Sequence, residues 1–214
     1  MYKKKPFFIV FEGVEGCGKS FQSKKLLNNL KKKRIPVLLT REPGGTKSAE
    51  LIRNLILKDY FNHDSKEKFD KYTDTLLYLA ARNEHIKNKI DPALKKKSVV
   101  ICDRFTDSTL AYQVYGKNVN INFINNIHKF ILGKIKPNLT FVLKVSTETS
   151  KKRLKKRKTK NRYDNFAQNF YSKAQNSFLK IAKNKKNYFV LNSSKNDRNL
   201  EKKIFKIVSA YLKI

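Results

Sequence analysis

A glycine-rich stretch directly after a short apolar run constrains the fold of this chain more than any other feature. Residues 7–11 read FFIVF, and residues 11–20 continue as FEGVEGCGKS. Gly13, Gly18, Lys19 and Ser20 match the pattern G-x-x-x-x-G-K-[ST]. In this pattern the backbone N–H groups of a loop converge on a polyphosphate, and the following helix adds the positive end of its dipole. The spacing therefore predicts a strand, a phosphate-binding loop and a helix.

The loop pattern also predicts which groups hold a nucleoside triphosphate. Lys19 is expected to reach the β- and γ-phosphates, and Ser20 is expected to hold Mg²⁺. The residues expected to bind ATP within this stretch are Gly13, Glu15, Gly16, Cys17, Gly18, Lys19 and Ser20.

Length and composition indicate a globular protein. The chain has 214 residues, enough for one substantial core, and 40% of them are hydrophobic. The longest early apolar run, residues 7–11, is too short for a signal peptide or a membrane span. We interpret the two cysteines, Cys17 and Cys102, as free thiols in a reducing environment. We therefore expect a cytoplasmic protein with no membrane partner.

The formal net charge of +32 invites a nucleic-acid interpretation, because clustered Lys and Arg neutralise phosphates. Of the 49 basic residues, however, nine are Arg, and the remaining 40 are Lys spread along the whole chain. Lys is a hydrated point charge that suits almost any surface, whereas Arg makes planar, two-pronged phosphate contacts. The pattern favours a compositional bias, with nonspecific attraction of polyanions as a side effect.

Short hydrophobic runs alternate with longer segments of helical periodicity. Strands are predicted at residues 7–11, 37–40, 98–102, 139–145 and 188–191, and helices at 19–33, 49–57, 73–90, 122–132, 147–157, 166–182 and 200–212. This alternation predicts an α/β fold with a five-stranded parallel sheet flanked by helices on both faces. No repeat, linker or second composition appears, so we expect a single domain over residues 1–214.

In a parallel sheet, ligands bind beyond the carboxyl ends of the strands. Residues 40–46 (TREPGGT) follow the second predicted strand there, and residues 103–113 (DRFTDSTLAYQ) follow the third. Asp103 has the placement of a Walker-B carboxylate, which orients Mg²⁺ or its waters together with Ser20. The guanidinium groups expected near this crevice are those of Arg41, Arg53, Arg82 and Arg104. The sequence thus predicts an acceptor site beside the phosphate loop.

With these motifs the chain resembles the bacterial type of thymidylate kinase. The matching segments are residues 11–20, 40–46, 76–82 (LLYLAAR) and 103–113, followed by an arginine-bearing segment up to residues 161–164 (NRYD). They occur in order along essentially the whole chain. The resemblance implies a P-loop nucleoside-monophosphate kinase fold with a short lid at about residues 151–165. It also implies transfer of the ATP γ-phosphoryl group to the 5′-phosphate of dTMP, giving dTDP and ADP, and a homodimer.

The resemblance assigns roles around the dTMP phosphate and base. Arg104 would grip the dTMP phosphate, and Arg53 would assist. Tyr78 would stack on the thymine, although its helical spacing taken alone favours a core position. Arg82 would hydrogen-bond the base, and Thr109 lies at a base-reading position that is often Asn or Ser in relatives.

The remaining pocket roles concern the sugar and the wall. Tyr112 would pack under the sugar and exclude a ribose 2′-hydroxyl, although taken alone it too is explained as a core aromatic. Gln113 and Pro43 would complete the wall. Glu15 would approach the sugar 3′-hydroxyl and the metal region.

The chemistry requires fixed positive charge more than a proton acceptor. The second pKa of a phosphate monoester is about 6, so the attacking oxygen is already ionised at neutral pH. Lys19, Mg²⁺ and arginines would bring two polyanions together and stabilise the transferred group. The loop itself holds no arginine, and the resemblance places this function in the lid. We favour Arg157 for the transferred phosphoryl group, with Arg153 and Arg162 assisting at ATP.

Two other enzyme classes remain possible from the residues. A deoxynucleoside kinase shares the fold, and Glu42 could serve it as the base that deprotonates a sugar hydroxyl. A GTPase is suggested by residues 88–91 (NKID), a match to N-K-x-D. That motif should follow a late strand, whereas this copy ends a helical segment before Asp103, so we interpret it as a coincidence.

A non-catalytic nucleic-acid-binding protein is the third alternative. It would use the charge of +32, but it would also need basic residues focused on one face or a reading element. Neither is visible in the sequence. We therefore expect ATP and dTMP as ligands and no specific nucleic acid.

Overall fold

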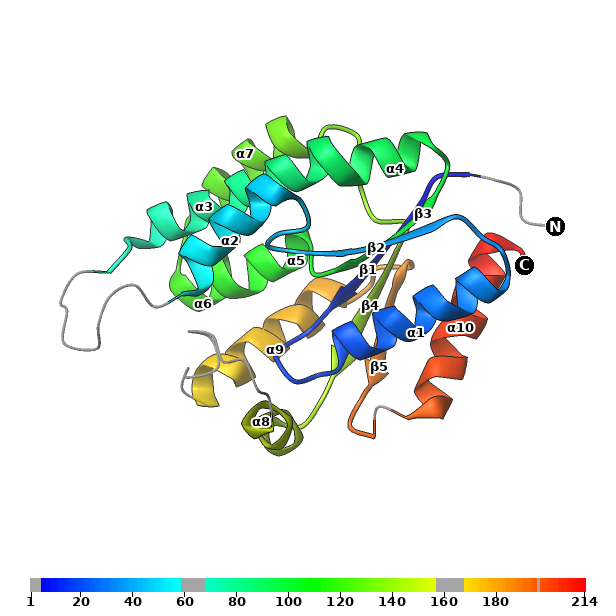
Figure 1. Cartoon of the computed structure of the whole chain (residues 1–214). Coiled ribbons are helices and arrows are strands. Elements are labelled where there is room, and N and C mark those ends of the chain that lie inside the picture. Colours follow the sequence, from blue (N-terminus) through cyan, green and yellow to red (C-terminus); the bar gives the residue numbers. More distant parts are fainter. Residues whose placement is uncertain (1–4, 59–67, 157–167, 196) are drawn as a thin grey trace.

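A five-stranded parallel sheet lies at the centre of the protein (Figure 1). The computed structural model describes residues 5–58, 68–156, 168–195 and 197–214. The strands are β1 (Phe7–Glu12), β2 (Val37–Arg41), β3 (Val99–Asp103), β4 (Leu139–Lys144) and β5 (Tyr188–Asn192), arranged in the order β2-β3-β1-β4-β5. All neighbouring strands run parallel. The α/β class and the sheet expected from the sequence are confirmed.

Helices connect the strands and cover the sheet. The longer ones are α1 (Lys19–Lys32), α2 (Lys47–Leu57), α3 (Lys71–His85), α7 (Ile121–Leu132), α8 (Thr147–Lys155), α9 (Gln168–Ala182) and α10 (Arg198–Leu212). The shorter helical segments are η1 (Ile86–Ile90), α4 (Asp91–Lys95), α5 (Thr106–Thr109), η2 (Leu110–Val114) and α6 (Tyr115–Lys117). None of these described helices combines the length and the apolar character that crossing a membrane requires.

Side chains alternate across β1 and so build two apolar layers. Phe7, Ile9 and Phe11 belong to the larger core, which includes buried residues of α1 and α10. Phe8 and Val10 belong to the core that Ile86 and Ile90 of η1 complete from the other side. Figure 1 shows the corresponding layers, with α1 and α10 on one side of the sheet and α3 and α4 on the other.

Two helices begin earlier than the hydrophobic periodicity predicts. The Thr46 hydroxyl accepts a hydrogen bond from the backbone N–H of Ala49, and Asp70 accepts one from that of Tyr72. These caps start α2 at Lys47 and α3 at Lys71, two residues before the predicted starts. The reason is that a cap lies ahead of the first buried residue and satisfies N–H groups that have no partner within the helix.

Two segments depart further from the predicted pattern. The helix expected over residues 73–90 changes after His85 into the π-helical turn η1 and then into α4. Residues 106–117, for which the sequence predicted no helix, form α5, the π-helical turn η2 and α6. A π turn shifts the side chains away from a 3.6-residue repeat, so the periodicity cannot reveal it.

The register of the strands brings three motifs to one edge of the sheet. Phe11 of β1 and Arg41 of β2 both pair with Asp103 of β3. The carboxyl ends of these strands are therefore level, and the segments that follow them begin side by side. This alignment positions the glycine-rich loop, residues 42–46 and residues 104–108 around one site.

Candidate active site

The glycine-rich loop lies between β1 and α1. Its glycines Gly13, Gly16 and Gly18 have φ values of 135°, 71° and 93°. Residues other than glycine adopt such values only under strain. A Cβ atom on Gly16 would also lie 2.8 Å from the backbone oxygen of Ser150 in α8. The ammonium group of Lys19 donates to the backbone oxygens of Gly13 and Val14 at 3.0 and 2.9 Å. The loop thus curls around the lysine that the sequence predicted to contact phosphates.

Ser20 and Asp103 meet at the start of α1. The Ser20 hydroxyl donates to Oδ2 of Asp103 at 2.5 Å. A hydroxyl and a carboxylate beside a phosphate loop suit Mg²⁺, which is usually held by one or two protein oxygens together with substrate phosphates. Within the described ranges, no group of three or more His, Cys, Asp and Glu side chains forms a metal cage. The donor set therefore fits a nucleotide-associated cation.

Arg104 lies at the centre of the acceptor side. Its Nη1 donates to the Gly13 backbone oxygen and to the Ser108 hydroxyl, both at 3.0 Å. Its Nη2 donates to Oε1 of Glu15 at 2.8 Å, and the Tyr112 hydroxyl donates to Oε2 of the same carboxylate at 2.7 Å. Burial acts to raise the pKa of Glu15, but the charges of Arg104 and Lys19 outweigh it and lower that pKa. Glu15 is therefore an anion held between two predicted substrate residues.

Glu12, which was not predicted as a site residue, holds the segment that follows Arg104 through hydrogen bonds. Its carboxyl group accepts hydrogen bonds from the backbone N–H of Phe105 at 2.8 Å and from the Ser108 hydroxyl at 2.6 Å. Burial, together with the nearby Asp107 carboxyl, raises the pKa of Glu12 to about 8. Glu12 is the last residue of the buried strand β1 and directly precedes Gly13. A carboxyl group at such a position needs hydrogen-bond partners, so its place in the sequence was an available signal for this role.

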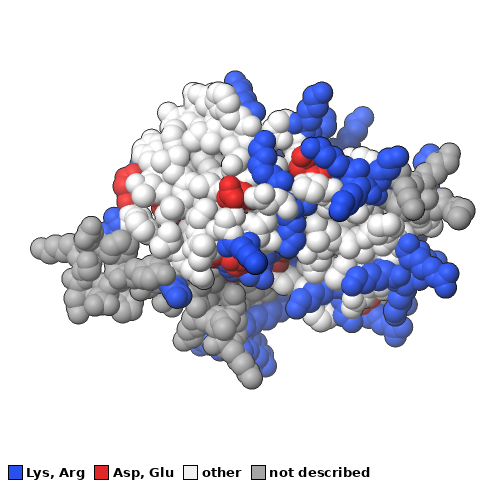
Figure 2. All heavy atoms as spheres, turned by 45° about the horizontal axis from the view of Figure 1, so that its top comes forward, with Lys and Arg blue, Asp and Glu red and all other residues white. Residues whose placement is uncertain are grey.

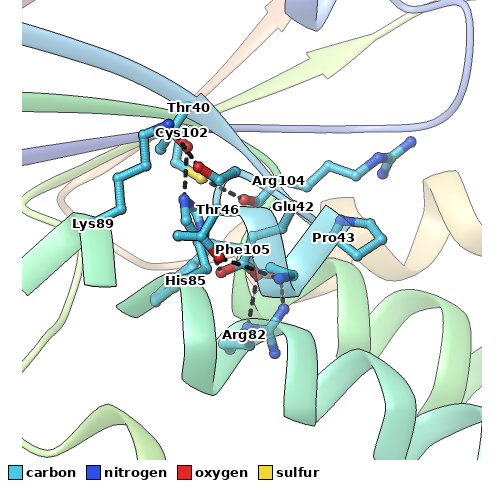
Figure 3. Close-up of polar contacts among 12 residues, drawn as sticks. Thr40, Glu42, Pro43, Thr46, Arg82, His85, Lys89, Cys102, Arg104 and Phe105 are labelled. Carbon is cyan, nitrogen blue, oxygen red and sulfur yellow. Dashed lines mark hydrogen bonds and ion pairs between the residues drawn. The ribbon is translucent and has the colours of Figure 1, made fainter. Parts of the chain in front are cut away.

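Arg82, predicted to contact the base, is held by four acceptors. Its Nε donates to Oε2 of Glu42 at 2.7 Å, and its Nη2 donates to the Phe105 backbone oxygen at 2.9 Å. Its Nη1 contacts the Thr109 hydroxyl at 2.8 Å and Nε2 of His128 at 2.9 Å. Figure 3 shows Glu42, from the segment after β2, facing both Arg82 and His85 of α3. The guanidinium is 3% exposed, so its orientation is fixed by these contacts.

The two histidines of this network were not predicted as site residues. His128 must accept at Nε2, because a guanidinium only donates, and burial and the charge of Arg82 lower the pKa of His128 to about 3. His85 Nδ1 lies 3.1 Å from Oε1 of Glu42, and its Nε2 lies 2.6 Å from the Thr40 hydroxyl. The spacing of Arg82 and His85, three residues apart on one helix face, was an available signal. His128 gave none, because it comes from a distant helix.

Arg153 of α8 joins three segments. It donates to the backbone oxygens of Gly16 at 3.1 Å and of Ser193 and Ser194 at 3.0 and 2.6 Å. It therefore ties α8 to the glycine-rich loop and to the segment after β5. The other two lid arginines of the sequence analysis, Arg157 and Arg162, lie outside the described residues.

A cavity of about 610 Å³ connects the two halves of the site. Its lining includes most residues predicted to bind ATP, metal or dTMP: Glu15, Gly16, Gly18, Lys19, Ser20, Pro43, Arg53, Tyr78, Arg82, Asp103, Arg104, Thr109, Tyr112, Gln113 and Arg153. Gly13 and Cys17 are not part of the lining, and Cys17 is fully buried. Residues that the sequence analysis did not assign to the pocket also contribute, namely Phe21, Leu57, Phe105, Ser108 and Leu154.

Comparisons with known proteins agree with this arrangement. The thymidylate kinase family model matches residues 11–204. The chain belongs to the thymidylate kinase family. The thymidylate kinase of Wolbachia pipientis is 42% identical over 82% of this chain and 84% of its own length. That of Mycoplasma capricolum is 37% identical over 96% of each chain.

A solved structure shares the fold of this thymidylate kinase family member. The thymidylate kinase from Ehrlichia chaffeensis superimposes with a TM-score of 0.74 at 29% sequence identity. The match covers 95% of this chain and 99% of that one. The P-loop kinase fold that the resemblance implied is therefore confirmed.

Proposed function

We propose that this chain is a dTMP kinase that transfers the γ-phosphoryl group of ATP to the 5′-phosphate of dTMP in dTTP synthesis. The observation that carries the proposal is the continuous cavity that joins the glycine-rich loop to the Arg104 and Arg82 pocket in a thymidylate kinase family member. A cavity of this form can hold a triphosphate and a monophosphate end to end.

The donor half acts through position and charge. Lys19 and the loop N–H groups would bind the β- and γ-phosphates. Ser20 and Asp103 would hold Mg²⁺, which supplies charge neutralisation on the phosphates. Arg157 would approach the transferred group, with Arg153 and Arg162 assisting at ATP. On this allocation, Arg157→Ala lowers turnover more than Arg162→Ala; the reverse order would assign the transferred group to Arg162.

The acceptor half binds dTMP by its phosphate and its base. Arg104, with Arg53, would hold the 5′-phosphate, whose ionised oxygen attacks without a base. Tyr78 would stack on the thymine, and Tyr112 and Glu15 would contact the sugar. Pro43 and Gln113 would complete the wall. Arg82 and Thr109 would read the base edge. The Nε2 of Gln113 is buried and has no hydrogen-bond partner among the described residues, which supports a ligand acceptor beside it.

The geometry around Glu42 disfavours a deoxynucleoside kinase. Burial acts to raise the pKa of Glu42, but the charge of Arg82 and the hydrogen bond from His85 outweigh it and lower that pKa. One oxygen contacts Arg82 and the other contacts His85. A carboxylate held in this way is a poor acceptor for the proton of a sugar hydroxyl.

A coupled ADP-release assay with ATP, Mg²⁺ and a panel of acceptors tests the proposal. We expect dTMP to be the preferred acceptor over dUMP, UMP, dCMP, dAMP, dGMP and thymidine. Arg104→Gln should lower kcat/KM for dTMP by roughly 10²-fold, the scale of removing a buried charge-assisted interaction with phosphate. A preference for thymidine, with activity abolished by Glu42→Gln and kept in Arg104→Gln, would instead establish a deoxynucleoside kinase.

We also propose that two copies associate through the face of α2, α3 and α7. Figure 2 shows this face largely free of charged side chains. Leu51 of α2 and Phe130 of α7 are 70% and 85% exposed, and Leu55, Leu76 and Ile121 are exposed beside them. An apolar face of this kind marks an interaction site.

Buried free thiols at Cys17 and Cys102 support a reducing, cytoplasmic location.

A further inference from the structure

The amino ends of the strands form the edge of the sheet opposite the cavity, and the connections that enter this edge are rich in lysine. They lead into β2, β3, β4 and β5 from α1, α4, α7 and α9. We use the name amino-edge surface for their exposed cations: residues 31–34 (KKKR), residues 95–97 (KKK), Lys134, Lys136, Lys185 and Lys186. Although these residues are far apart in the sequence, the parallel topology collects them on one side.

The amino-edge surface has little negative charge to balance it. The connecting segments at residues 31–36, 95–98, 133–138 and 183–187 contain no Asp or Glu. Asp91 in α4 pairs with Lys95 at 2.7 Å, and Glu15, Glu42 and Asp103 lie at the opposite edge. Figure 2 shows blue side chains gathered on the side where the two termini lie in Figure 1. The amino-edge surface is therefore a concentration of positive charge with little acid beside it, although exposed lysines also occur on α8 and α10. The sequence could not reveal this grouping.

Helix dipoles explain only part of this pattern. Cations are favoured in the last turn of a helix, and Lys31, Lys32 and Lys95 occupy such positions in α1 and α4. Lys33 and Lys96 are the C-cap residues of these two helices, where a cation is favoured as well. Lys134 and Lys136 follow the end of α7, and Lys185 and Lys186 follow the end of α9, so these four lie outside the last turns. Close spacing of like charges is unfavourable in itself, so a bound polyanion would relieve their repulsion.

The dimensions and chemistry of the amino-edge surface fit a nucleic-acid backbone. Neighbouring strands are about 4.8 Å apart, so five strands give an edge roughly 20 Å across. Duplex DNA carries one charge per about 1.7 Å of its axis, both strands counted, so about 20 Å of duplex carries roughly a dozen phosphates. About half of them lie on the side that faces such an edge. The surface is lysine-rich and has one arginine, Arg34, which suits point-charge contacts to phosphate more than reading of bases.

A membrane surface fits less well. Peripheral binding to lipid combines cations with exposed apolar side chains that enter the interface. The exposed large apolar side chains of the described chain lie mainly on other faces, such as Leu51 of α2 and Phe130 of α7. Within the connecting segments, Ile35 is buried and Ile135 is half-buried.

We propose that the amino-edge surface binds the phosphodiester backbone of double-stranded nucleic acid without sequence preference. The cavity lies at the opposite edge of the sheet, so a bound duplex leaves it open to nucleotides. Binding of a duplex is therefore independent of phosphoryl transfer. This proposal does not depend on which nucleotide accepts the phosphoryl group.

A charge-matched pair of variants separates a binding surface from net charge alone. The edge variant combines Lys33→Gln, Lys96→Gln, Lys134→Gln and Lys186→Gln. The control variant combines Lys24→Gln, Lys47→Gln, Lys202→Gln and Lys203→Gln, which are exposed positions on α1, α2 and α10. Fluorescence anisotropy measures binding of each protein to duplex DNA and to duplex RNA of mixed sequence over a salt series. Kinase activity and circular dichroism serve as checks of folding.

The wild type should bind a duplex with an affinity that falls steeply as salt rises. The edge variant should bind roughly ten-fold more weakly, with a log–log salt slope that is shallower by about 0.9 for each lysine–phosphate interaction that it removes. The control variant should stay within about two-fold of the wild type, and both variants should keep wild-type kinase activity. Binding of only DNA or only RNA would support the proposal for that duplex. Equal losses of affinity in both variants, no duplex binding, or tighter binding to phosphatidylserine vesicles would overturn it.

Discussion

Arg82 shows how one side chain depends on partners that are distant in sequence. Its acceptors come from the segments after β2 and β3, from α5 and from α7. The ionised Glu42 offsets its buried charge, and His128 offers a neutral nitrogen instead of a second negative charge. The proposed base contact therefore requires a guanidinium whose orientation is already set, which lowers the ordering cost of binding.

Replacing His128 tests this arrangement at the residue scale. His128→Ala leaves a buried Arg82 N–H without its acceptor, which lowers the stability of the fold by about 1–3 kcal/mol. It also removes one contact that fixes the orientation of the guanidinium, so we expect KM for dTMP to rise roughly ten-fold with little change in kcat. His128→Asn restores a neutral acceptor and should recover most of the affinity. Steady-state kinetics with dTMP and dCMP measures both effects. A positioning role would be contradicted if kcat fell by as large a factor as KM rose in His128→Ala, or if His128→Asn did not recover the affinity for dTMP.

The pKa of His128 adds a pH dependence with a defined sign. Its pKa is about 6.5 when unfolded and about 3 in the folded chain, so the unfolded state binds the proton more readily. The contribution of His128 to stability is present above pH 6.5 and is lost as the pH falls toward 3. Denaturation midpoints measured across this range should fall less steeply for His128→Asn than for the wild type.

At the scale of elements, the sequence predicted the strands closely and the helices less so. Runs such as residues 7–11 are buried on both faces, so their continuous apolar character identified β1 directly. Residues 106–117 escaped prediction because α5, η2 and α6 are short and a π turn interrupts their repeat. Tyr112 and Gln113 lie in that turn, so only the resemblance pointed to them. Glu12, His85 and His128 depend on tertiary contacts that no local pattern encodes.

The contact between the glycine-rich loop and α8 is a prediction at this scale. Gly16→Ala places a Cβ atom 2.8 Å from the Ser150 backbone oxygen at a φ of 71°, so the loop or α8 must move. We expect KM for ATP to rise by roughly ten-fold or more, while binding of dTMP to the free enzyme changes little. Gly133→Ala is the matched control, since its φ is 53° but its Cβ meets no atom within 4 Å. Equal effects of the two changes on KM for ATP would point to backbone strain alone.

At the scale of the whole molecule, three surfaces have distinct chemistry. The cavity collects arginines and carboxylates, the opposite edge of the sheet collects lysines with few acids, and the face of α2, α3 and α7 is largely free of charged side chains (Figure 2). Composition alone gave the net charge of +32 without its direction. Long-range topology creates these differences, because parallel connections return every strand start to one edge.

The apolar face of α2, α3 and α7 gives the last prediction, which concerns assembly. Leu51 is 70% exposed on α2, and burying it against a second copy removes apolar surface worth about 25 cal/mol per Å². Leu51→Glu would place a charge in that interface without a partner, so we expect light scattering to report a dimer for the wild type and a monomer for the variant. Val190→Glu is the control, because Val190 is 46% exposed on β5, away from this face. Leu51 lies on the surface and outside the cavity lining, so the circular dichroism of the variant should be unchanged. A Leu51→Glu protein that stays dimeric, or a wild type that is monomeric at micromolar concentration, would place the function of this face elsewhere.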